Sequence, residues 1–159
     1  LKNCRCFNFY YMDQFQFFAY LVSSLIISLS VHEYAHAYTA NYFGDPTAKI
    51  AGRLTLNPFA HIDPLGLIMV FIARFGWGKP VPVNPYNLRN PRWHGLAVAL
   101  AGPVSNFLLA LICGGLYQAS YFLPELQMLF AFMVQINVVL MIFNLIPIPP
   151  LDGSKILMA

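Results

Sequence analysis

The chain has 159 residues, of which 58% are hydrophobic and only 9% are charged, and its mean hydropathy is +0.60. Soluble domains carry about 25% charged residues, so this composition excludes an ordinary water-soluble globule and indicates a protein that lies in a lipid bilayer. The formal net charge of +3 comes from scattered residues without a basic, aromatic-rich cluster, which argues against nucleic acid as a partner. The three cysteines, Cys4, Cys6 and Cys113, fit no disulfide framework or zinc-ribbon spacing.

The first predicted element is an apolar helix over residues 15–42. It is longer than the roughly 20 residues that a hydrocarbon core requires, and residues 15–31 contain no charged side chain. Lys2 and Arg5 precede this run as in a signal peptide, but the run has no small-residue cleavage site, so we expect it to be retained. Three ionisable side chains, His32, Glu33 and His36, then lie within the same helix.

A short and less regular region follows. Residues 47–56 alternate loosely in hydrophobicity and contain a glycine, which predicts a β-hairpin or an extended stretch. Asn57-Pro58 and Asp63-Pro64 mark turns. Residues 65–75 are apolar, but this length of helix covers only about 16 Å, roughly half a hydrocarbon core, so a re-entrant or half-buried membrane segment is expected.

Two further spanning helices are predicted in the second half of the chain. Residues 76–95 are rich in Gly, Pro and Asn and form an extended loop. Helices follow over residues 93–123, where Pro103 should introduce a kink, and over residues 125–146. A proline-rich turn then precedes a possible helix that begins at Ser154.

The predicted fold class is therefore an all-α polytopic membrane protein. It has three transmembrane helices, one short or re-entrant membrane segment, and a small extended or β-hairpin region. We expect residues 1–159 to form a single membrane-embedded core without a further C-terminal transmembrane helix.

The distribution of basic residues predicts the orientation, because Lys and Arg prefer the cytoplasmic side of a membrane. The loop over residues 74–92 carries four of them, whereas the turn between the last two spanning helices carries none. Lys49 and Arg53 place the other flank of the short segment on the same side. His32, His36 and Asp152 are then expected at a similar depth near the cytoplasmic face, although Lys2 and Arg5 argue for the opposite orientation.

The sequence H-E-x-x-H at residues 32–36 predicts a metal site. His32 and His36 are four residues apart and share one helix face, so both can bind one ion, while Glu33 can accept a proton from a metal-activated water. A catalytic zinc usually has a third protein ligand and one open position. Asp152 is the best-placed candidate, because the proline-rich turn and Gly153 allow the backbone to direct its carboxylate inward. The other candidates are Asp13, Asp45, His61, Asp63, His94, Cys113 and Glu125.

Each of these residues also has a structural interpretation. Asp152 could cap a helix that begins at Ser154, and Asn106 and Asn144 could form hydrogen bonds between helices. His61 and His94 fall in loops, where histidines are usually surface residues. The histidine pair is different, because ionisable groups within a membrane cost about 2.5–3.5 kcal/mol each, which favours a functional role.

Taken together, five motifs in this order resemble the site-2 proteases, zinc metalloproteases that cleave substrates within the membrane. The resemblance covers residues 25–155, and H-E-x-x-H alone would be much less specific. The motifs are HEYAH at residues 32–36, NPFAHIDPLG at 57–66, KPVPVN at 79–84, AGPVSN at 101–106 and LDG at 151–153.

The resemblance implies one Zn²⁺ ion held by His32, His36 and Asp152, with Glu33 as general base. It further implies that Asn106 helps to hold the substrate or the oxyanion and that Asn144 positions the substrate. His61 matches a motif residue without an assigned role. The short 65–75 segment and the absence of PDZ and CBS domains depart from the family pattern.

The expected function is hydrolysis of peptide bonds in membrane-spanning proteins or peptides by an integral protein of a prokaryotic cytoplasmic membrane, with the active site toward the cytoplasm. The substrate must unwind or present an extended strand, which could pair with residues 47–56. The alternative is a catalytically silent protein that binds membrane helices, or a metal-handling membrane protein. No ligand or base is missing, and the helices offer no acidic relay for transport, so the protease interpretation is favoured.

Overall fold

The computed structural model describes residues 13–73 and 78–158. Lys2, Arg5, Cys4, Cys6 and Arg74 therefore lie outside the described residues. The helices in the described ranges are α1 (Gln14–Tyr42), α2 (Thr47–Ile50), α3 (Pro64–Ala73), α4 (Pro91–Ala119), α5 (Pro124–Leu145) and α6 (Asp152–Met158), with short 3₁₀ turns η2 (Pro58–Ala60) and η3 (Pro85–Asn87).

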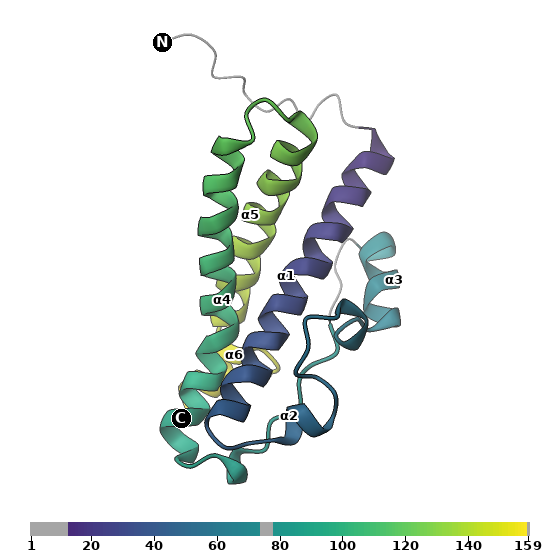
Figure 1. Ribbon diagram of the computed structural model, residues 1–159. Coiled ribbons are helices and arrows are strands. Elements are labelled where there is room, and N and C mark those ends of the chain that lie inside the picture. The colour runs from purple at the N-terminus through teal and green to yellow at the C-terminus, as the bar shows by residue number, and fades with distance from the viewer. Residues whose placement is uncertain (1–12, 74–77, 159) are drawn as a thin grey trace.

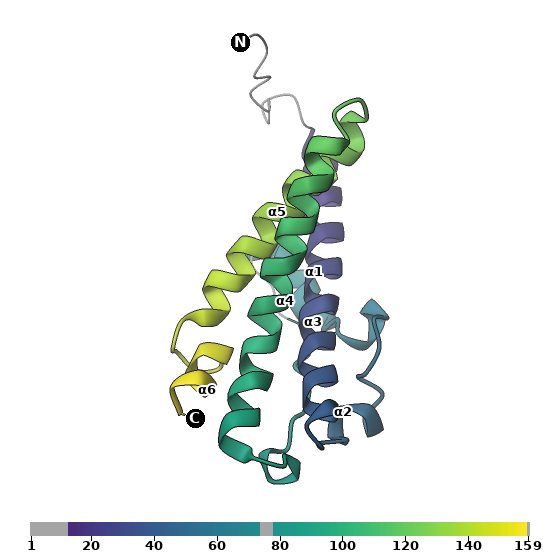
Figure 2. The same cartoon turned by 60° about the vertical axis from the view of Figure 1, so that its left-hand side comes forward.

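Three long apolar helices form the body of the molecule (Figure 1). α1 and α4 have 29 residues each and α5 has 22, and all three are long and apolar enough to cross a membrane. α4 packs against both α1 and α5 and runs antiparallel to each of them (Figure 2). The three predicted spanning segments are thus confirmed, with boundaries within a few residues of those expected.

Small and polar side chains fill the interface between these helices. Ser24 and Ser28 of α1 and Asn106 of α4 are fully buried, and Asn137 of α5 donates a hydrogen bond to Ser28 Oγ over 2.8 Å. Small residues allow close approach of helices in a membrane, where lipid removes the usual hydrophobic drive for association. Large apolar side chains such as Leu111 and Ile142 instead lie on the outside, where lipid replaces water as their solvent.

The predicted hairpin at residues 47–56 is wrong. Residues 47–50 form α2, and no strand occurs within residues 13–73 and 78–158, where an isolated bridge joins Ile62 to Gly78. The loose hydrophobic alternation was overridden by local turn chemistry. Asp45 accepts a hydrogen bond from the amide of Thr47, which starts a helical turn, and Gly52, with φ of +68°, ends it.

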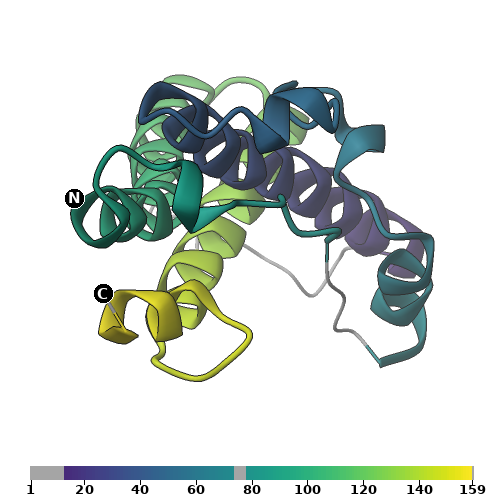
Figure 3. The ribbon, with the colours of Figure 1, turned by 90° about the horizontal axis from the view of Figure 1, so that it is seen from below.

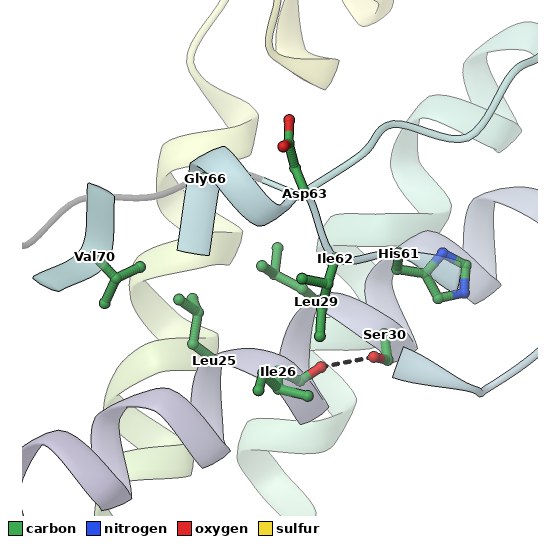
Figure 4. A pocket seen from close by; sticks show the side chains of 10 residues that line it. Leu25, Ile26, Leu29, Ser30, His61, Ile62, Asp63, Gly66 and Val70 are labelled. Carbon is green, nitrogen blue, oxygen red and sulfur yellow. Dashed lines mark hydrogen bonds between the residues drawn. The ribbon is translucent and has the colours of Figure 1, made fainter. Parts of the chain in front are cut away.

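The short apolar segment does not reach the far end of the bundle. α3 has 10 residues, and the antiparallel bridge between Ile62 and Gly78 brings its two flanks together. A cavity of about 20 Å³ separates α3 from α1, and Figure 4 shows Leu25 of α1 and Val70 of α3 on its sides, with His61 and Asp63 at its margin. This volume is close to that needed by a single water molecule.

The end of the bundle at which α1 finishes also carries α2, the start of α4 and α6 (Figure 3). α4 continues through Pro103 without a break, although proline leaves the carbonyl of Ala99 without its helical donor. A turn containing a cis bond between Pro149 and Pro150 follows α5. The chain then folds back, and α6 packs against both α4 and α5.

Candidate metal centre

The two histidines of α1 lie side by side at its lower end. His32 and His36 are separated by one helical turn, and their ring centroids are 4.6 Å apart. Both side chains are buried, with 3% and 6% exposure. Their Nε2 atoms approach to 3.0 Å, so both rings direct the same nitrogen toward one point.

Asp152 reaches that point from the far end of the sequence. It is the first residue of α6, and its Oδ2 atom lies 3.2 Å from His32 Nε2 and 2.9 Å from His36 Nε2. Its two oxygens contact the histidines and Lys155, so the capping role that the sequence left open is not the one observed.

The protonation of His36 indicates why a cation belongs among these atoms. His36 Nδ1 lies 2.7 Å from the carbonyl oxygen of Val98, which can only accept, so Nδ1 carries the proton and donates it. In the neutral ring, Nε2 then presents a lone pair toward the carboxylate of Asp152 and the ring of His32. Such a set of converging donors suits a metal ion, and the Val98 contact is the outer hydrogen bond typical of a metal-binding histidine.

The spacing of the three donor atoms also fits zinc. Zinc bonds of about 2.0–2.2 Å in a tetrahedron separate neighbouring ligand atoms by about 3.3 Å. The observed separations of 2.9–3.2 Å are only a few tenths of an ångström shorter. Within the described residues, this is the group of His, Cys, Asp and Glu side chains whose ligand atoms are close enough to share one ion. Three protein ligands leave a fourth position free, as in catalytic rather than structural zinc sites.

Gly102 of α4 forms the floor under the two rings. A Cβ atom at this position would lie closer than 3.0 Å to His36 Nε2 and to both Cε1 and Nε2 of His32. Only glycine therefore allows α4 to approach the histidines this closely. The sequence carried a signal for it, because Gly102 belongs to the AGPVSN motif, but sequence analysis gave a role only to Pro103 and Asn106 of that motif.

The second oxygen of Asp152 is held by Lys155. Lys155 Nζ lies 3.0 Å from Asp152 Oδ1, one helical turn further along α6. Burial favours the neutral acid, but the hydrogen bonds to His32 and His36 and the charge of Lys155 hold the pKa of Asp152 well below its usual range. The carboxylate is therefore ionised, as a metal ligand must be.

Glu33, His32, His36 and Asp152 line one cavity of about 540 Å³. Glu33 Oε2 accepts a hydrogen bond of 3.0 Å from the backbone amide of Val81. The cavity is also lined by residues of the extended segment that sequence analysis predicted, namely Pro80, Val81 and Val83. This size lies within the range of about 300–1,000 Å³ typical of small-ligand sites.

The two candidate asparagines have different positions. Asn144 lines the same cavity, and its Nδ2 atom donates to the carbonyl oxygen of Leu140 over 3.0 Å. Asn106 is fully buried inside the bundle and is not among the residues that line the cavity. Neither side-chain atom of Asn106 has a hydrogen-bond partner among the described residues. The structure thus brings Asn144, but not Asn106, to the cavity.

His61 and His94 are not part of this centre, and His61 does not lie where sequence analysis expected. His61 is 1% exposed rather than on the surface, and its Nε2 atom lies 2.8 Å from the carbonyl oxygen of Thr55. His94 fell where the predicted loop and the predicted helix over residues 93–123 overlap; it belongs to the first turn of α4, and its ring stacks on Phe43 at a centroid distance of 4.1 Å. The contacts of both side chains thus stabilise the segments that connect α1 to α4.

Comparison with known proteins points to the same chemistry. The sequence model of the family described as peptidase family M50 matches residues 115–159 of this chain. The "Putative zinc metalloprotease YwhC" of Bacillus subtilis is 46% identical to this chain over an alignment of 160 residues. That alignment covers 92% of this chain and 73% of that protein. The chain belongs to peptidase family M50, the site-2 protease type of zinc metalloprotease.

Other M50 relatives are more distant. The "Putative zinc metalloprotease Rip2" of Mycobacterium tuberculosis is 37% identical over 147 residues, and that of Mycolicibacterium smegmatis is 36% identical over 145 residues. The chain spans 55% of the length of these two mycobacterial proteins. No solved structure matches it significantly. Membership of family M50, together with three helices that could cross a membrane, identifies the chain as an integral membrane zinc metalloprotease.

Proposed function

We propose that this M50 protein hydrolyses peptide bonds of membrane-spanning proteins or peptides, with one zinc ion held by His32, His36 and Asp152. The observation that carries the proposal is the convergence of three buried donor atoms beside Glu33, at the wall of a cavity between apolar helices. Residues 1–159 would act as a single membrane-embedded core.

Glu33 is the proposed general base. Zinc, when bound, would lower the pKa of a water molecule toward about 7 and polarise the scissile carbonyl. Glu33 would accept the proton of the attacking water and later transfer it to the leaving amine. The amide of Val81 occupies one carboxylate oxygen, Oε2, which leaves the other oxygen for this proton transfer.

Asn144 is the better candidate for contact with the substrate. Its Nδ2 atom is bound to the carbonyl oxygen of Leu140, so its Oδ1 atom is the group left to accept a hydrogen bond from a substrate amide. Asn106 does not line the cavity, so no contact between its side chain and a bound substrate follows from the structure. The oxyanion role that the family resemblance implies for Asn106 stays a prediction.

The location of the centre sets the form in which a substrate can be cleaved. A transmembrane helix keeps its carbonyl groups in internal hydrogen bonds, so the cleaved segment must enter the cavity unwound. The centre lies at the end of α1 where the basic connecting segments gather, and this supports a site near the cytoplasmic face of a prokaryotic membrane. The joined flanks of α3 support a re-entrant segment on that side.

The test is cleavage of a single-span membrane substrate by purified, zinc-loaded protein and by Glu33→Gln. We expect Glu33→Gln to retain one zinc ion and to lose cleavage by about 10²–10⁴-fold, the usual contribution of general acid–base catalysis. Glu125→Gln is the matched control, because Glu125 lies in the first turn of α5 and contacts Tyr20, at the other end of α1. Unchanged cleavage by Glu33→Gln would refute the proposal.

A further inference from the structure

Residues 79–84, here called the strap, contribute Pro80, Val81 and Val83 to the lining of the cavity and are anchored at both ends. At the first end, Gly78 pairs with Ile62, and the amide of Lys79 donates to the carbonyl oxygen of His61 over 2.8 Å. At the other end, the amide of Asn84 donates to Asp45 Oδ2 over 2.7 Å. The strap is therefore fixed at one end to the segment before α3 and at the other to the segment that follows α1.

The middle of the strap contacts the proposed base. The amide of Val81 donates to Glu33 Oε2 over 3.0 Å. Pro80 and Pro82 have no amide hydrogen, so Val81 is the donor available in this central stretch. A shift of the strap by about an ångström would break this hydrogen bond, because hydrogen bonds weaken beyond about 3.2 Å.

Asp45 is the anchor that has no other assigned role. Its side chain is fully buried, just beyond the end of α1. Besides the amide of Asn84, it accepts hydrogen bonds from Thr47 N over 3.1 Å, from Asn87 Nδ2 over 3.0 Å, and from the hydroxyl of Thr47. Burial opposes ionisation, but these hydrogen bonds outweigh it and lower the pKa of Asp45 below its ordinary value.

The strap is thus held at two points along one stretch of chain. Glu33 contacts the strap from within α1, which runs nine more residues, or about 13 Å, to Tyr42, and Asp45 contacts the end of the strap three residues after the helix ends. Because Asp45 closely follows the end of α1, the position of Val81 relative to Glu33 depends on the Asp45 anchor together with the His61 anchor.

We propose that Asp45 is a positioning residue for Glu33, and that it acts through the strap by holding the Val81 amide against one carboxylate oxygen. This inference rests on the proposed function, because it assigns a purpose to the orientation of the base. A free glutamate side chain samples several rotamers, and fixing one oxygen keeps the other in the geometry that proton transfer requires.

The first experiment compares Asp45→Ala with Asp13→Ala in the zinc-loaded protein. Asp13 also accepts a backbone amide, that of Gln16, but at the opposite end of α1. For Asp45→Ala we expect kcat to fall at least about tenfold, while KM changes less than about twofold, because geometry at the reacting centre affects the chemical step. The zinc content and the absorption spectrum of the cobalt-substituted protein should stay unchanged, since the hydrogen bond from the strap goes to Glu33 and not to a proposed zinc ligand. Asp13→Ala should keep the wild-type kcat.

A second comparison does not depend on whether Asp45→Ala folds well. Val81→Pro removes the amide hydrogen and keeps three side-chain carbons, whereas Val81→Ala keeps the amide hydrogen and removes two methyl groups. We expect kcat of Val81→Pro to fall at least about tenfold below that of Val81→Ala. Equal kcat values for these two variants would overturn the proposal.

Hydrogen exchange separates this inference from the proposed function, because it needs no substrate. Within residues 80–84 only Val81, Val83 and Asn84 carry exchangeable amides. Asp45→Ala should accelerate their exchange, and Asp13→Ala should not. Unchanged exchange in Asp45→Ala would show that Asp45 does not hold the strap, whatever the cleavage assay gives. Inactive wild-type protein with accelerated exchange in Asp45→Ala would instead refute the proposed function and retain the anchor.

Discussion

Gly102 is the residue on which the packing of both histidine rings depends. Interiors are dense, and an extra methyl group without space typically costs about 1–3 kcal/mol. In Gly102→Ala the new Cβ would contact three ring atoms of His32 and His36, two of which are proposed zinc-binding nitrogens. The two imidazole rings would have to turn away from Asp152, and the affinity for zinc would decrease.

We therefore expect Gly102→Ala to bind zinc at least about tenfold more weakly than the wild type, since about 1.4 kcal/mol corresponds to a factor of ten. Competition with a chromophoric chelator measures this change. Gly115→Ala is the matched control, because it lies in the same helix and its Cβ would have no neighbour within 4 Å. Equal zinc affinity of the two variants would contradict the proposed role of Gly102.

The positions of individual site residues could be predicted from the sequence where the residues are close together in one helix. His32 and His36 are local on one helix, so their convergence follows from helical geometry alone. The position of Asp152 required an argument from depth in the membrane, and the structure does bring it to the histidines. Gly102 was missed because a glycine signals close approach only when the neighbouring helix is known. His61 was expected at the surface because the burial of a loop depends on tertiary contacts.

At the scale of elements, the placement of α6 determines where Asp152 lies, because Asp152 is the first residue of this helix. Gly153 is its second residue, and a Cβ there would lie closer than 3.0 Å to the carbonyl oxygens of Leu145 and Ile146 at the end of α5. The direction in which α6 leaves the proline-rich turn thus depends on the close approach of its first turn to α5.

Gly153→Ala should displace α6 and withdraw Asp152 from the histidines, because backbone carbonyls cannot move aside as a flexible side chain can. We expect loss of zinc binding and of cleavage in a protein that retains its helical circular dichroism. Ser154→Ala serves as the neighbouring control. It removes a 2.7 Å hydrogen bond to the carbonyl of Leu151, costs about 1 kcal/mol of stability and should leave zinc bound. A fully zinc-loaded, active Gly153→Ala would refute this account.

Long elements were predictable and short ones were not, for a physical reason. An apolar run of more than 20 residues has few alternatives to a spanning helix, because lipid satisfies no backbone polar group. α1, α4 and α5 follow directly from this constraint. Residues 47–56 have no such constraint, and there the side chain of Asp45 shapes the local fold by accepting a hydrogen bond from the amide of Thr47, the first residue of α2.

At the scale of the whole molecule, the two ends of the bundle differ in charge. Lys49, Arg53, Lys79 and Arg89 lie between the end of α1 and the start of α4, Arg92 lies in the first turn of α4, and Lys155 lies in α6. The turn at residues 120–123, between α4 and α5, carries no basic residue. The metal centre lies toward the basic end, so the orientation of the bundle decides which face of the membrane supplies water to the reaction.

Thiol labelling in intact cells tests this orientation. In a protein whose native cysteines are replaced, we expect Tyr121→Cys to react with a membrane-impermeant reagent from outside, because Tyr121 is 54% exposed in the turn between α4 and α5. Lys49→Cys, at an exposed position of α2, should react only after the cells are permeabilised. The positive-inside preference is the physical basis, since translocation of Lys and Arg is disfavoured. The reverse labelling pattern would move the metal centre to the outer face and would require the substrate to enter from there.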